Sequence, residues 1–261
     1  EAVAFSDATA TTVIDVAASN PALGAGAARV ITGTNIADAI TGGNGGDTLI
    51  GGAGDDNLTG GAGADALLGG TGNNTYTYTA AGQAAAGETI TFNTTTGANE
   101  TIAVNTASVD LSEINAGALL TGLDNVTIAA GLTATMDAAQ VSGLTMTTTG
   151  IAAAETLALN GTASADTIDL SNLVLANALV TVAAGAGDDA ITANAGGGTF
   201  TGGAGADTIT GGAGSDIVSY ADVTLASSHS LANLTGVAVN LSTASVTTAT
   251  VTAAMGGTIV L

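Results

Sequence analysis

The sequence predicts an all-β fold, a right-handed parallel β-helix or β-roll solenoid, and three observations support this prediction. Glycine pairs return every nine residues between Gly33 and Thr77. Within each nonapeptide an aspartate or asparagine stands at the sixth place and an aliphatic or aromatic residue at the eighth. Outside the nonapeptides the chain is rich in Thr, Val and Ile, which favour strands. Such a period is typical of short strands that stack through tight turns.

The first repeat block covers residues 33–77 and contains five nonapeptides in one phase: GTNIADAIT, GGNGGDTLI, GGAGDDNLT, GGAGADALL and GGTGNNTYT. The sixth places are Asp38, Asp47, Asp56, Asp65 and Asn74, and the eighth places are Ile40, Leu49, Leu58, Leu67 and Tyr76. Paired glycines permit a tight turn that exposes carbonyl oxygens. The eighth side chain is expected to point inward from a short strand. Two nonapeptides then form one coil, so residues eighteen apart stack on the same side.

Stacked aspartates repel one another unless a cation lies between them. Calcium suits such a gap, because it accepts six to eight oxygen ligands from carboxylates and carbonyls. The period pairs Asp38 with Asp56 on one edge and Asp47 with Asp65 on the other. The next pair, Asp56 with Asn74, is expected to be weaker because an amide carries no charge. The backbone carbonyls of the first glycines in the turns are the expected additional ligands: Gly42, Gly51 and Gly60.

A second repeat block begins at Ala184 and reads AGAGDDAIT, ANAGGGTFT, GGAGADTIT and GGAGSDIVS. It supplies Asp189, Asp207 and Asp216, with the carbonyls of Gly202 and Gly211, whereas Gly198 interrupts the aspartate series. Upstream, GTASADTID supplies Asp166 as an outlying partial copy. Fewer or weaker ions are therefore expected in this block than in the first.

Both blocks resemble the RTX (hemolysin-type) calcium-binding repeats of secreted bacterial proteins. The resemblance implies several bound Ca²⁺ ions and one-step, type I secretion directed by the C-terminus. The Ala/Thr/Gly-rich spacer between the blocks resembles bacterial S-layer proteins. A flexible Gly-rich linker is the disfavoured alternative, because linkers do not hold Asp and an apolar residue in fixed phase.

Composition excludes several kinds of partner. One basic residue stands against 22 acidic ones, for a net charge of −21, so the chain cannot neutralise nucleic-acid phosphates or bind an anionic membrane surface. At 46% hydrophobic it is too apolar for a disordered acidic tail. There is no cysteine, no apolar run long enough for a membrane span and no recognisable N-terminal signal. The sequence begins at Glu1 without methionine, so we expect a piece of a longer polypeptide.

The predicted organisation has five parts. They are a lead-in or cap (1–32), a first β-roll block (33–79), a Thr/Ala-rich β-solenoid spacer (80–160), a second β-roll block (161–222) and a C-terminal β tail (223–261). In the lead-in, TTVIDV is a candidate strand and SNPALGAGA a loop. The tail alternates as VAVNLS and ends in TIVL, which predicts two or three further strands and an apolar end able to pair with another segment.

The spacer is predicted to continue the solenoid with wider coils of about 22 residues. Inward residues recur there and into the second block: Ile90, Ile102, Ile114, Val126, Met136, Met146, Leu157, Ile168, Val180, Ile191, Phe200, Ile209 and Val218. The competing layout is two β-rolls joined by a β-sandwich. A short helix at residues 112–120 is a further alternative.

No catalytic arrangement stands out. The single histidine, His229, lies in a polar stretch and is expected at the surface, and with no lysine there is neither a phosphate-binding P-loop nor Schiff-base chemistry. The adjacent carboxylates Asp55–Asp56 and Asp188–Asp189 occupy repeat positions. The remaining acids are scattered and are expected to be solvated loop residues: Asp110, Glu113, Asp124, Asp137 and Glu155.

These observations favour a structural, calcium-binding segment of a secreted bacterial surface-layer or extracellular assembly protein, with no enzymatic activity. It would fold and self-assemble outside the cell into a lattice, sheet or filament. Contact with cell-surface polysaccharide would fall to another part of the full-length protein. The alternative is the C-terminal calcium-binding RTX module of a larger type I-secreted enzyme or adhesin.

Overall fold

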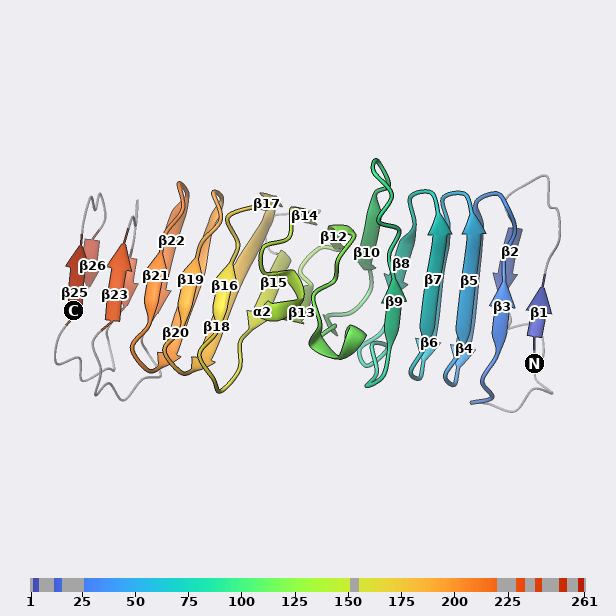
Figure 1. The fold of residues 1–261 in the computed structure, drawn as a ribbon, viewed down its shortest axis with the longest axis horizontal. Coiled ribbons are helices and arrows are strands. Elements are labelled where there is room, and N and C mark those ends of the chain that lie inside the picture. The colour runs from blue at the N-terminus through green and yellow to red at the C-terminus, as the bar shows by residue number, and fades with distance from the viewer. Residues whose placement is uncertain are drawn as a thin grey trace. The chain divides into compact units, whose positions relative to one another are not determined.

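The computed structural model describes residues 26–150 and 155–219 with their side chains. It also places the backbone of short strands at residues 2–4, 12–15, 229–232, 238–240, 249–252 and 258–260. The chain divides into two compact units, residues 1–134 and 135–261, which are described in turn (Figure 1).

Unit 1 contains two sets of strands that alternate along the chain. The first set pairs in the order β1 (Ala2–Ala4), β3 (Val30–Thr32), β5 (Thr48–Ala53), β7 (Ala66–Thr71) and β9 (Thr89–Thr91). The second pairs in the order β2 (Thr12–Asp15), β4 (Asp38–Asn44), β6 (Asn57–Ala62), β8 (Thr75–Tyr78), β10 (Glu100–Val104) and β12 (Leu123–Ile128). The unit also holds β11 (Val109–Asp110) and the single-turn 3-10 helix η1 (Ile114–Gly117).

Strand register in unit 1 follows the repeat period. Val30 pairs with Thr48 and Thr48 with Ala66, so each coil of the first block is eighteen residues long. Beyond the block the coils widen, with Ala66 opposite Thr89. The strand pairs described in both units are parallel, which argues against a sandwich, whose sheets are antiparallel. The predicted all-β parallel fold is confirmed, and its right-handedness stays a prediction.

The core of unit 1 is built from the eighth residue of each nonapeptide. In β4 the burial alternates residue by residue, as a strand with one inward face requires. Side chains from both sets of strands are almost fully buried: Ile31, Leu49, Leu67 and Ile90 from one set, and Ile40, Leu58, Tyr76, Ile102 and Val126 from the other. Each such aliphatic side chain stabilises the roll by roughly 1.5–3 kcal/mol.

The two positions that open each turn require glycine for different physical reasons. At Gly51 a Cβ would lie 2.3 Å from Oδ2 of Asp56 and 2.4 Å from the carbonyl oxygen of Gly69, so no side chain fits there. Gly52 has a φ of +116°, a conformation that other residues rarely adopt. The first glycine therefore leaves room for the aspartate of its own repeat, and the second reverses the chain.

Unit 2 repeats this construction. Its first set of strands pairs in the order β15 (Glu155–Asn160), β18 (Ala178–Ala186), β20 (Gly197–Ala204), β22 (Ser215–Ser219), β24 (Ala238–Asn240) and β26 (Thr258–Val260). Its second pairs in the order β16 (Thr167–Asp169), β19 (Ala190–Thr192), β21 (Thr208–Thr210), β23 (His229–Ala232) and β25 (Ala249–Thr252). A further pair joins β14 (Met146–Gly150) to β17 (Leu173–Ala176), next to the short helix α2 (Ala138–Val141), while β13 (Thr133–Asp137) crosses the unit boundary.

Every inward residue expected in the spacer and the second block is buried, from Ile90 to Val218. Of the alternative helix at 112–120 only η1 is present, because Asn115 and Ala116 have positive φ values of 53° and 50°. Strand β3 lies inside the stretch expected as a lead-in, yet it pairs with β5 in the register of the roll. The tail contains the four strands β23 to β26, more than the two or three expected. The side chain of His229 and most of the expected loop SNPALGAGA lie outside the described residues.

Candidate metal site

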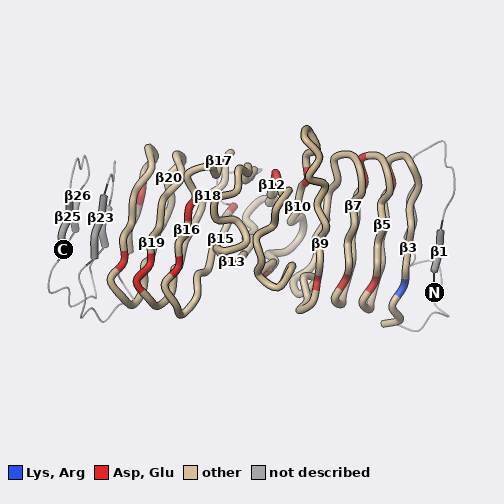
Figure 2. Tube along the Cα trace, viewed as in Figure 1, with Lys and Arg blue, Asp and Glu red and all other residues tan. Residues whose placement is uncertain are grey.

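The sixth residues of the first block form two ladders, each running along the starts of the strands of one set (Figure 2). Ladder A contains Arg29, Asp47, Asp65 and Glu88, which precede β3, β5, β7 and β9. Ladder B contains Asp38, Asp56, Asn74, Glu100 and Asp124, which begin or directly precede β4, β6, β8 and β10 or lie in β12. The pairing of Asp38 with Asp56 and of Asp47 with Asp65 is the one expected from the eighteen-residue coil.

Each ladder is linked by the same hydrogen bond. The backbone N–H of one rung donates to the side chain of the rung on the next coil. Asp38 N donates to Oδ1 of Asp56 at 2.8 Å, and Asp47 N donates to Oδ1 of Asp65 at 2.7 Å. The sequence pattern does not predict this bond. It supplies a donor to one oxygen of each carboxylate and none to the other oxygen.

The second carboxylate oxygens are buried without a hydrogen-bond partner. Asp38, Asp47, Asp56 and Asp65 are at most 2% exposed. Among the described residues, Oδ1 of Asp38 and Oδ2 of the other three accept no hydrogen bond. A buried charge without a partner is costly, so these oxygens require a proton or a cation.

Burial changes the acidity of these groups. It raises the pKa of Asp56 and of Asp65 to about 6. Burial also raises the pKa of Asp47, and the neighbouring Arg29 acts against this rise. Desolvation favours the neutral form of a carboxyl group. The carboxylates of the calcium-free ladders therefore bind protons more tightly than free carboxylates do, and a bound cation would displace these protons.

Arg29, the one Lys or Arg residue of the chain, occupies the first described rung of ladder A. Its side chain is 6% exposed. Its Nη1 donates to the carbonyl of Gly42 at 2.9 Å and to that of Asn44 at 3.4 Å, and lies 3.7 Å from Oδ2 of Asp47. A cation thus lies beside two turn carbonyls and a carboxylate, and two of these groups, the Gly42 carbonyl and the Asp47 carboxylate, were expected to bind calcium.

The rung after Asp65 in ladder A and the rung after Asn74 in ladder B are glutamates whose two oxygens are occupied. Oε2 of Glu88 accepts the Asp65 N–H at 3.0 Å, and its Oε1 accepts the Tyr78 hydroxyl at 2.8 Å. Oε1 of Glu100 accepts the N–H of Asn74, and its Oε2 accepts the Tyr76 hydroxyl at 2.8 Å. Burial raises the pKa of Glu88 to about 7 and also raises that of Glu100. These rungs need no cation to complete their hydrogen bonds.

In the second block one ladder is continuous. Ladder C contains Asp166, Asp189 and Asp207, which precede β16, β19 and β21. Asp166 N donates to Oδ1 of Asp189 at 2.8 Å, and Asp189 N donates to Oδ1 of Asp207 at 3.0 Å. Oδ2 of Asp189 is buried without a hydrogen-bond partner. Burial raises the pKa of Asp189.

In the described part of the other strand set of unit 2, Asp216 is the one position-six aspartate. It lies opposite Gly198 across β20 and β22. Its Oδ2 accepts the N–H of Gly212, the residue after Gly211, at 3.1 Å, while its Oδ1 is buried and accepts no hydrogen bond from the described residues. Val180 fills the space beside Gly198, because a Cβ there would lie 2.5 Å from Cγ1 of Val180.

The first aspartates of the two blocks are held alike. Oδ2 of Asp38 accepts the N–H and the hydroxyl of Thr34, at 2.6 and 2.9 Å. Oδ2 of Asp166 accepts the same two groups of Thr162, at 2.6 and 3.0 Å. The GTxxAD sequences that open both series therefore mark a threonine that caps the first carboxylate.

Three acids expected in solvated loops lie elsewhere. Glu155 begins β15 and is fully buried, and Asp124 is half-buried and accepts the N–H of Glu100 at 2.8 Å. Asp137 is half-buried at the end of β13 and caps the N-terminus of α2. No nonapeptide spacing predicts these positions. Asp110 and Glu113 are exposed, as expected, and so are the position-five residues Asp55 and Asp188.

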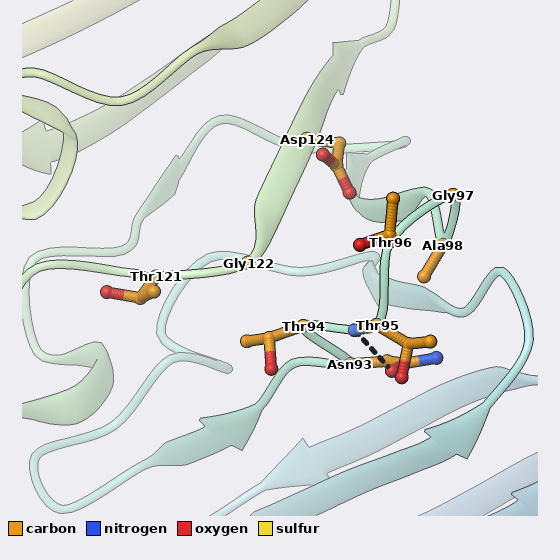
Figure 3. A pocket seen from close by; sticks show the side chains of 9 residues that line it. All are labelled: Asn93, Thr94, Thr95, Thr96, Gly97, Ala98, Thr121, Gly122 and Asp124. Atoms are coloured by element: carbon orange, nitrogen blue, oxygen red, sulfur yellow. Dashed lines mark hydrogen bonds between the residues drawn. The ribbon is translucent and has the colours of Figure 1, made fainter.

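Next to the end of ladder B lies a pocket of about 320 Å³, lined by residues 93–98 together with Thr121, Gly122 and Asp124 (Figure 3). Four of its nine lining residues are threonines, and Thr95 N donates to Oδ1 of Asn93. Asp124 is the one titratable side chain in this lining, so the pocket holds no pair of carboxylates for acid–base chemistry.

The ligand chemistry of the ladders suits a hard divalent cation. Beside the first glycines Gly42 and Gly51 a carboxylate oxygen and a carbonyl oxygen converge: a Cβ on Gly42 would lie 2.6 Å from Oδ2 of Asp47 and 2.6 Å from the carbonyl of Gly60. At Gly60 and Gly202 a Cβ would meet the carboxylates of Asp65 and Asp207. Among the described residues no three acidic or histidine side chains gather at one point, so carbonyls must supply much of any shell, as calcium permits.

Comparison with known proteins agrees with this chemistry. The sequence matches the family model for the RTX calcium-binding nonapeptide repeat (4 copies) over residues 41–76 and 192–222. No curated protein and no solved structure showed significant similarity to the chain. Within the described part of the chain, no helix has the length and apolar character needed to cross a membrane. The chain therefore carries RTX nonapeptide repeats of the type that binds Ca²⁺ and occurs in secreted proteins.

Proposed function

We propose that this chain is a structural segment of a secreted bacterial surface-layer or extracellular assembly protein that folds when calcium fills its ladders. The observation that supports this proposal is that Asp38, Asp47, Asp56 and Asp65 each have a buried carboxylate oxygen without a hydrogen-bond partner among the described residues. In this proposal calcium lies between Asp38 and Asp56, between Asp47 and Asp65, and between Asp189 and Asp207. The first-glycine carbonyls complete each shell.

Calcium-dependent folding is the first expected outcome. Extracellular-type sites bind calcium with dissociation constants of about 10⁻⁴ to 10⁻³ M, so the chain should be largely unfolded at cytosolic calcium and folded outside the cell. Circular dichroism during a calcium titration measures this transition, with magnesium as the control ion. An unchanged β spectrum in excess chelator would contradict the proposal.

Self-assembly is the second expected outcome. Three large apolar side chains of unit 2 face solvent on β17, β18 and β22: Val174, Leu179 and Ile217, between 43% and 56% exposed. At a net charge of −21, contacts between identical chains are repulsive until a divalent cation reduces the charge. We expect ordered sheets, tubes or filaments in millimolar calcium that dissolve on chelation, observed by negative-stain microscopy.

The second candidate is a calcium-binding module of a larger type I-secreted enzyme or adhesin. The repeat match favours it to the same degree, because it covers the nonapeptides and not the spacer. A protein that carries its native flanking sequence and stays monomeric across the calcium range would favour this module over the assembly role. In either case the proposed role of this chain is calcium-dependent folding without catalysis.

A further inference from the structure

Among the described rungs of the ladders, Arg29 alone carries a cation. Arg29 is the sixth residue of GAGAARVIT (residues 24–32), one nonapeptide upstream of the first block. Its backbone follows the ladder rule, since Arg29 N donates to Oδ1 of Asp47 at 2.8 Å. The residues after it form β3, with Ile31 fully buried at the eighth place. This nonapeptide therefore keeps the register of the repeats, with arginine where aspartate would stand.

The guanidinium contacts the atoms that surround the other rungs. Relative to Arg29, its partners lie 13, 15 and 18 residues later: the carbonyls of Gly42 and Asn44, and the carboxylate of Asp47. Counted from Asp47, the same steps reach Gly60, Ala62 and Asp65. Counted from Asp38, they reach Gly51, Ala53 and Asp56.

The turn fits a compact ion better than it fits a guanidinium. One nitrogen, Nη1, contacts both carbonyls and the carboxylate. Nε of Arg29 is buried and donates no hydrogen bond within the described residues. A guanidinium offers five N–H donors in a fixed planar fork. The oxygens around Arg29 therefore interact with its positive charge but accept hydrogen bonds from only some of its donors.

We propose that Arg29 is a built-in substitute for a calcium ion, which joins the coil of β3 to the coil of β5 without metal. Asp47 then has a permanent cation on one side and requires calcium only on the side of Asp65. The inference rests on the proposed calcium sites and adds a site that arginine occupies in their place. Its consequence is that the contact between β3 and β5 forms at lower calcium than the contact between β5 and β7.

The first test compares two variants of the whole chain with the unmodified protein at saturating calcium. Arg29→Asp restores an aspartate at position six, and Ala28→Asp adds the same carboxylate at position five, where the exposed Ala28 matches Asp55. Equilibrium dialysis with elemental analysis counts bound calcium. Arg29→Asp should bind one calcium more than the unmodified protein, and Ala28→Asp should bind the same number.

Arg29→Gln removes the charge without adding a ligand. It should raise the calcium midpoint for folding about three- to tenfold, because a charge-assisted hydrogen bond is roughly twice as strong as the neutral one that an amide can donate. Equal calcium counts for Arg29→Asp and the unmodified protein, or an unchanged midpoint for Arg29→Gln, would overturn the substitution while leaving the calcium sites intact. An unmodified protein that binds no calcium would instead overturn the sites themselves.

Discussion

In unit 1 the described part of ladder A runs from a cation to a carboxylate with both oxygens occupied. Its first described rung is Arg29 and its last is Glu88, whose carboxylate accepts the Tyr78 hydroxyl. In the second block ladder C begins at the half-buried Asp166, and the neighbouring strand set carries Asp216 opposite Gly198. The same nonapeptide thus builds ladders of carboxylates along both strand sets in one unit and mainly along one set in the other.

This difference separates two tasks of the repeat. The glycines and the eighth residues build the coil in both blocks, as the burial of Leu58 and Ile209 shows. The sixth residues decide how much uncompensated charge a coil contains. A coil with Gly198 at that place still stacks, because Val180 occupies the space. Folding of the second block is therefore expected to depend on fewer ions.

The largest expected effect comes from removing a central rung of the first block. Asp56→Ala leaves Asp38 N without its acceptor and removes a carboxylate placed between Asp38 and Asn74. We expect the calcium midpoint of folding to rise about tenfold or more, because a lost charged ligand costs about 1.5–3 kcal/mol. Circular dichroism in a calcium titration measures the shift. The control is Asp110→Ala, which removes an exposed carboxylate outside the ladders; equal midpoints would show that the ladders do not carry the ions.

A smaller effect is expected from pH in the absence of calcium. The pKa of Asp56 is raised from 3.8 to about 6, and that of Glu88 from 4.5 to about 7. The folded chain therefore binds more protons than the unfolded chain between pH 4 and pH 7, and stability falls as pH rises through this window. Acidification from pH 8 to pH 5 should increase the folded fraction in chelator, measured by circular dichroism. A smaller folded fraction at pH 5 would contradict the burial of these groups, and Asp56→Asn should weaken the effect.

The smallest effect is expected from an attempt to repair the second block. Gly198→Asp restores the consensus residue, yet its Cβ would meet Cγ1 of Val180 at 2.5 Å and Cζ of Phe200 at 3.0 Å. We expect a loss of about 1–3 kcal/mol from overpacking and no additional calcium ion. Thermal unfolding in saturating calcium, together with a calcium count, measures both. A stabilised variant with one more ion would show that the gap at Gly198 is open and that the two blocks differ only in composition.

Much of the fold could be predicted because its period is written in the residues. An apolar residue every nine places, later every ten to twelve, predicted the buried series from Ile90 to Val218. The candidate site could be predicted at Asp38, Asp47, Asp56 and Asp65, because stacked carboxylates demand a cation. The roles of Glu88 and Glu100 could not, because they join the ladders 23 and 26 residues after the preceding rung, where the nonapeptide spacing has ended.

By itself, then, the sequence determined the parallel coil, its inward residues and the chemical class of its ligand, since each depends on a period that local turns preserve. Tertiary structure alone decided how the ladders end. Arg29 is a lone basic residue in the sequence, and it becomes a cation on the Gly42 carbonyl only when the first coil stacks on the second. Tyr78 and Glu88 meet for the same reason. A buried carboxylate at this position needs a hydrogen-bond donor, and only the stacking of the coils brings the Tyr78 hydroxyl within reach of it.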